Sequence, residues 1–95
     1  MKKPHSFKLV NGKFAAHDVR KILMEMIQSK INYHTREIFS LEERGGDTTH
    51  SEKRVVQLRK SAETLKKVLS KAEAKGSNLS VTVQVEIEFL DYKVY

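Results

Sequence analysis

Two long stretches of the chain carry apolar side chains at alternating steps of three and four residues. This spacing is typical of one face of an α-helix packed against a neighbouring helix. Gly45 and Gly46 lie between the two stretches and predict a turn. When the chain is folded back at these glycines, the apolar positions pair in register: Leu41 with Ser51, Ile38 with Val55, His34 with Leu58, Ile31 with Ala62, Ile27 with Leu65 and Met24 with Leu69. The pattern predicts an antiparallel helical hairpin.

The predicted helices cover residues 15–44 and 47–75. Asp18 falls in the first turn of the first helix, where a carboxylate suits the positive end of the helix dipole. Thr49 and Glu52 fit the S/T-x-x-E capping box at the start of the second helix. Gly76 predicts where the second helix ends.

The first helix carries a second apolar strip beside the first, so it needs a partner besides the second helix. This strip consists of Val19, Ile22, Met26 and Tyr33. Residues 79–90 supply the expected cover. Six apolar residues alternate strictly with polar ones from Leu79 to Phe89, which predicts a strand with one buried face. We expect this face, including Val83, Val85 and Ile87, to pack on the second strip of the helix.

Residues 6–14 are the remaining strand candidate. Asn11 and Gly12 suit a two-residue hairpin turn, so the segment is predicted to be either one strand or a very short hairpin. Residues 1–5 are expected to be a flexible arm, and residues 91–95 a tail. The fold class that follows is α+β in the order β-α-α-β, with a long antiparallel helical hairpin packed on a small antiparallel sheet in a single domain of residues 1–95.

The long carboxy-terminal strand has an unpaired edge in this arrangement, and such an edge is a template for pairing with another chain. We therefore expect a homodimer in which two copies share the sheet, because two-fold symmetry satisfies both edges at once. Sheet or dimer packing is assigned to Val19, Ile22, Met26, Tyr33, Val83, Val85 and Ile87. A four-helix bundle made from two hairpins is the alternative way to bury the second strip of the first helix, and the sequence leaves dimer or tetramer open.

The composition narrows the chemistry. The chain has 95 residues and no cysteine, which excludes disulfides, thiol nucleophiles and thiolate metal sites. No segment reaches the roughly 20 apolar residues of a membrane span, and a secretory leader pattern is interrupted from Pro4 onward. The expectation is a cytoplasmic protein that does not act at a membrane.

The titratable residues do not form a recognisable active site. His5, His17, His34 and His50 lack the spacing of a metal site, and His34 reads best as a histidine of the helix seam. Acidic residues near the turn are interleaved with basic ones and read as a solvated helix end. We therefore assign no catalytic, metal or cofactor-binding residues, expect no small-molecule ligand, and predict that the protein is not an enzyme.

The net charge of +6 is concentrated in the amino-terminal arm and the second helix. Four lysines of that helix lie on one stripe opposite its apolar ladder: Lys53, Lys60, Lys67 and Lys71. Such a stripe can follow a phosphate backbone, and Glu63 is placed to pair with Lys67. The leading expectation is a structural or protein-interaction protein that acts as a homo-oligomer. The alternative is a nucleic-acid-associated protein that uses the lysine stripe and the amino-terminal arm.

Overall fold

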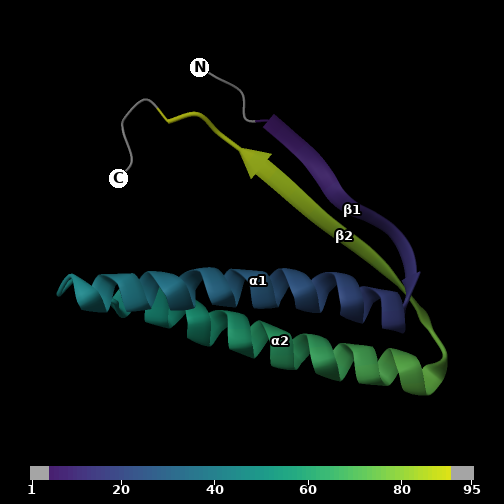
Figure 1. The fold of residues 1–95 in the computed structure, drawn as a ribbon. Coiled ribbons are helices and arrows are strands. Elements are labelled where there is room, and N and C mark those ends of the chain that lie inside the picture. The colour runs from purple at the N-terminus through teal and green to yellow at the C-terminus, as the bar shows by residue number, and fades with distance from the viewer. Residues whose placement is uncertain (1–4, 91–95) are drawn as a thin grey trace.

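The computed structural model describes residues 5–90 and has the predicted order of elements. Strand β1 covers His5–Ala15, helix α1 covers Ala16–Glu43, helix α2 covers Thr49–Lys75 and strand β2 covers Asn78–Ile87. The two strands pair antiparallel, and the two helices form a hairpin that leads from one strand to the other (Figure 1). The fold is α+β. The expected arm and tail lie largely outside the described residues.

The seam between the helices contains the side chains that the two apolar ladders predicted. The buried residues of this seam are Ile31, His34, Ser51, Ala62, Leu69 and Ala72. Ala62 and Ser51 are small, so α2 contributes little apolar volume to this part of the seam. At the end of the hairpin nearest the strands, the guanidinium of Arg20 lies 2.5 Å from the carboxylate of Glu73 and joins the two helices.

The amino-terminal segment is one continuous strand, so the short hairpin at Asn11–Gly12 is not formed. Gly12 pairs directly with Val81, and the register shifts once, between Lys8 and Val10, where Leu9 bulges out of the ladder. Gly12 has no positive φ angle. A Cβ there would lie 3.3 Å from the ring of Phe14, so the glycine provides room for that ring. Long-range pairing with β2 therefore overrides the local turn preference of Asn-Gly.

The hydrophobic core lies where the strands meet the helices. Its buried residues are Ala16, Val19, Leu69 and Ala72, with Phe14, Leu23, Leu65, Leu79 and Val81 packed against them. Beyond this closed end the two strands diverge from α1, so that sheet and hairpin form the arms of a V (Figure 1). The sheet therefore covers only the beginning of α1. Within one chain, the expected cover over Met26 and Tyr33 is absent, and these side chains are 37% and 55% exposed.

The start of α2 differs from the predicted capping box. Thr49 is already helical, and its amide and hydroxyl both donate to Asp47 Oδ1, at 2.9 and 2.6 Å. In a capping box the Glu52 carboxylate would accept a hydrogen bond from the Thr49 amide. Here the Asp47 carboxylate accepts that hydrogen bond instead. The end of α2 is as predicted, because Gly76 adopts the left-handed conformation with φ of 65°.

Candidate interaction surfaces

The sheet has one apolar face, which looks toward α1 across the open end of the V. Phe14, Leu79 and Val81 touch the core from this face. The pairing register places Val10 and Val83, Phe7 and Val85, and His5 and Ile87 on the same side of the sheet. Away from the core this face loses its cover: Val83 and Val85 are half-buried, whereas Phe7 and Ile87 are each 50% exposed.

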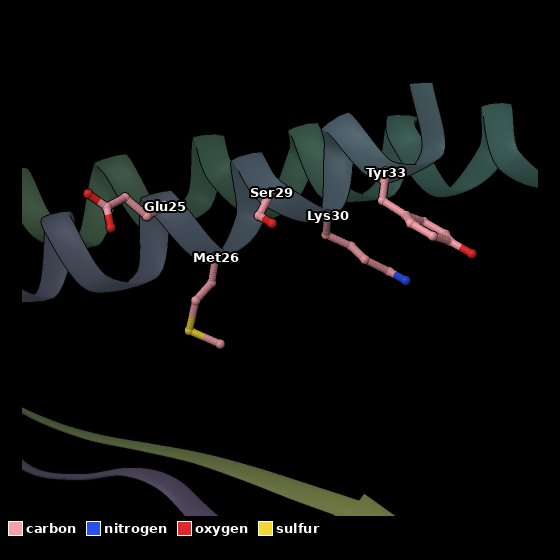
Figure 2. A pocket seen from close by; sticks show the side chains of 5 residues that line it. All are labelled: Glu25, Met26, Ser29, Lys30 and Tyr33. Carbon is pink, nitrogen blue, oxygen red and sulfur yellow. The ribbon is translucent and has the colours of Figure 1, made fainter. Parts of the chain in front are cut away.

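The opposite arm presents the second apolar strip of α1. Val19 is buried in the core and Ile22 is half-buried, but Met26 and Tyr33 lie beyond the reach of the strands. An open hollow of about 510 Å³ follows the helix here and is lined by Glu25, Met26, Ser29, Lys30 and Tyr33. Figure 2 shows the Met26 side chain pointing from α1 toward the strands. The Lys30 ammonium lies 4.7 Å from the Tyr33 ring centroid, so the far end of this strip is partly cationic.

The two free edges of the sheet differ in a way that matters for pairing. Within residues 5–90 each strand has only the other as a neighbour. The β1 edge carries the bulge at Leu9 and the lysines Lys8 and Lys13, which are the features that protect natural edge strands. Strand β2 is ten residues long, contains no proline, glycine or lysine, and pairs without a bulged residue of its own. The β2 edge is therefore the one suited to accept another strand.

The lysine stripe of α2 lies on the outer side of the hairpin, away from the seam. Lys53, Lys60, Lys67 and Lys71 are all exposed. Among the described residues, none of these four lysines has a carboxylate within 4.0 Å of its ammonium group. Glu63, which was expected to pair with Lys67, pairs with Lys66 instead. Val56 and Val68 are exposed on the same helix at 52% and 46%. The structure thus brings the four lysines to one accessible surface without neutralising them.

The seam contains a polar cluster of His34, Glu37 and Ser51, which the sequence predicted only in part. His34 is 6% exposed, and its Nδ1 lies 3.5 Å from Glu37 Oε1. The Ser51 hydroxyl donates to the same carboxylate oxygen from the other helix. This hydrogen bond lowers the pKa of Glu37, and the nearby His34 and His50 lower it further. The three-residue spacing of His34 and Glu37 was a readable signal, but the approach of Ser51 depends on how the helices cross.

The arrangement around His34 is not that of a nucleophile with its base. Ser51 is 2% exposed and its hydroxyl donates to the Glu37 carboxylate, so this hydroxyl is enclosed between the two helices, away from solvent. In the described part of the chain, no three His, Asp or Glu side chains gather closely enough to hold a metal ion. The geometry is that of a hydrogen-bonded link between two helices.

Comparisons with known proteins add no relative. No family model, no curated protein and no solved structure matches the chain. Neither α1 nor α2 is apolar enough over its length to cross a membrane, within the residues that the structure describes.

Proposed function

We propose that this protein is a non-enzymatic interaction module that works as a homodimer, with the two copies sharing one sheet through their β2 strands. The observation that carries the proposal is the open V. Its two inner walls are apolar, they belong to one chain, and they do not cover each other. A two-stranded sheet is marginally stable in water unless further strands or a helix complete it.

The dimensions of the chain support a missing partner. Its radius of gyration is 17.0 Å, whereas a compact chain of this length has a value of about 12 Å. Its accessible surface is 7900 Å², compared with about 5,600 Å² for a compact monomer of 11.0 kDa. A standard interface buries about 800 Å² on each partner, so the excess surface is ample for one.

A second copy is the partner that the β2 edge fits best. Antiparallel pairing centred on Val83 places Val81 opposite Val85 of the second copy and Leu79 opposite Ile87, so one apolar face continues across four strands. The same register sets Glu86 against Ser80 and therefore avoids like charges at the interface. The β1 strands become the outer edges, which their bulges and lysines protect.

Light scattering after size exclusion tests the dimer. At tens of micromolar we expect a mass twice the 11.0 kDa of one chain. The double variant Thr82→Glu with Gln84→Glu places like charges opposite each other twice in the proposed register, and it should dissociate the dimer. The control, Thr82→Glu with Gln84→Lys, changes the same two positions but places opposite charges there, and it should remain dimeric. A wild-type mass of one chain would contradict the proposal.

The unneutralised lysines of α2 favour a second candidate, which is binding to a nucleic-acid backbone. Four phosphate contacts predict that the logarithm of the binding constant for duplex DNA falls with the logarithm of salt concentration at a slope of about −3 to −4. Replacing Lys60 and Lys67 by glutamine should reduce this slope by about 2, whereas Lys30→Gln on α1 should leave it unchanged. Absence of binding at about 150 mM salt would remove this candidate.

A further inference from the structure

We infer that the closed end of a second copy completes the uncovered part of the apolar sheet face, with Ile87 of each chain packed on Leu79 of the other. The inference rests on the proposed sharing of the sheet and names the contact that joins the two hydrophobic cores. It assigns an occupant to the part of the sheet that extends beyond its own core, where Phe7 and Ile87 are each 50% exposed.

The alternation of β2 restricts how two copies of this strand can pair. Directly opposite residues of an antiparallel pair point to the same side of the sheet, so a centre between two residues would set apolar side chains against polar ones. A centre at Thr82 or Gln84 leaves Ile87 or Leu79 opposite a residue outside β2. Pairing centred on Val83 is the register in which all the apolar residues of this face in β2 lie opposite one another.

This register brings the open end of one copy beside the closed end of the other. Strand β2 runs from the closed end of the V to the open end, and its antiparallel copy runs the opposite way (Figure 1). The two-fold axis is perpendicular to the sheet, so both apolar faces lie on the same side. Ile87 then lies directly opposite Leu79 of the second copy, with Cβ atoms about 4.5–5.5 Å apart. Leu79 packs against the buried core of its own chain, which consists of Ala16, Val19, Leu69 and Ala72.

The charges on the polar face of the sheet agree with the same contact. Lys13 pairs with Ser80 near the closed end, and Glu86 lies near the open end of β2. In the proposed register Ser80 of one copy lies opposite Glu86 of the other, so Lys13 and this glutamate are two strand positions, or about 10 Å, apart. Their long side chains span this separation when they extend toward each other. Among residues 5–90, neither forms an ion pair within its own chain.

A pair of cysteine variants tests the contact between Ile87 and Leu79, because the chain has no native cysteine. Directly opposite residues of an antiparallel pair have Cα atoms about 4.5–5.5 Å apart, which a disulfide spans. Ile87→Cys and Leu79→Cys chains are unfolded and refolded together and then oxidised. We expect this mixture to form a covalent dimer on a non-reducing gel, and a reductant to reverse it.

Each variant on its own is the matched control. Since position 87 lies opposite position 79, two cysteines at position 87 are about 26 Å apart along the strands, which no disulfide spans. The same separation applies to two cysteines at position 79. We expect the mixture to cross-link on the order of tenfold faster than either variant alone.

The accessibility of the Ile87→Cys thiol is a second measurement, which leaves Leu79 and the core unchanged. Ile87 is 50% exposed in the single chain, and the proposed contact covers it. Labelling by a thiol-reactive probe should therefore slow on the order of tenfold as the protein concentration rises and the dimer forms. Leu9→Cys, in the bulge of β1 and 55% exposed, is the control and should label at a constant rate.

The outcomes separate the inference from the proposed dimer. If light scattering gives a dimer for the wild type but the mixture cross-links no faster than the single variants, the dimer stands and the contact between Ile87 and Leu79 is wrong. If Leu79→Cys does not fold, the labelling rate of Ile87→Cys decides, and a constant rate overturns the contact. If light scattering gives a single chain for the wild type, the shared sheet and the contact fail together. Selective cross-linking of the mixture supports both.

Discussion

At the residue scale, the most informative side chains are those whose surroundings the apolar pattern only partly indicated. The pattern placed His34 in the seam, and the structure buries it there. It did not indicate that Ser51 would donate to Glu37, because that contact joins residues fourteen positions apart across the turn. A sequence pattern identifies a helix face, whereas the crossing of two helices decides which polar groups on those faces meet.

The Glu37–Ser51 contact predicts a dependence of stability on pH. The Ser51 hydrogen bond lowers the pKa of Glu37 below its ordinary value of 4.5, so the folded state holds this proton less tightly than the unfolded state does. The stabilisation is therefore complete above about pH 4.5 and is lost as pH falls through the lowered pKa. Urea unfolding should give the wild type a higher free energy of unfolding than Glu37→Gln at pH 7. This difference in the free energy of unfolding should shrink toward pH 3. A difference that stays constant with pH would contradict a stabilising role of the ionised Glu37 carboxylate.

Leu69 gives a prediction about packing, because it is the most deeply buried side chain of the core. It is 0% exposed and lies where α2 meets α1 and the sheet. Leu69→Ala should destabilise the fold by about 2–5 kcal/mol, through lost burial and the cavity left behind. Val68→Ala changes the neighbouring residue, which is 46% exposed, and should cost less than about 0.5 kcal/mol. The denaturant midpoints of the Leu69→Ala and Val68→Ala variants should differ. Similar midpoints would show that Leu69 is not a residue of the core.

At the scale of elements, periodicity predicted the helices and β2, whereas local turn motifs predicted only some of the turns. The helices begin and end within two residues of the predicted 15–44 and 47–75. Strand β2 begins one residue before the predicted 79–90 and ends three residues before its predicted end. Residues 6–14 form the strand, which was one of the two forms predicted, and the Thr49–Glu52 capping box is not formed, since a short motif describes only what a peptide prefers. Pairing with β2 keeps the glycine in a strand, and Asp47 takes the amide of Thr49.

Gly76 is the turn residue whose role the sequence predicted and the structure confirms. Its φ of 65° lies in the left-handed region, and its amide donates to the last turn of α2. Gly76→Ala should cost about 1–2 kcal/mol, because a Cβ is strained in this conformation. No atom lies within 4 Å of that Cβ, so the cost would come from the backbone alone. Ser77→Ala provides a control, and thermal unfolding that ranks the two variants equally would contradict the assignment.

At the scale of the whole molecule, the covering of α1 was the main expectation that the single chain does not meet. Strand length and alternation suggested that β2 would follow α1 to its far end. They contain no information on the angle between sheet and hairpin, which depends on how residues such as Ala16, Ala72 and Phe14 pack at the closed end. The result is a thin molecule with extents of 49 × 37 × 15 Å and apolar surfaces on both inner walls.

These apolar surfaces are the reason for which we propose a dimer. Strand β2 offers an unprotected edge, and α1 leaves Met26 and Tyr33 exposed. The lysines of α2 stay on the outside of such a dimer, where the two copies would present them to solvent or to a phosphate backbone.

The proposed dimer pairs β2 on both of its edges, and amide hydrogen exchange of the β2 backbone is the direct test of this pairing. A strand with one neighbour protects the amides of alternate residues, whereas a strand with two neighbours protects consecutive ones. For the dimer we expect slow exchange at every residue from Val81 to Val85, together with alternating protection in β1 from Asn11 to Phe14. Alternating protection in both strands would contradict it.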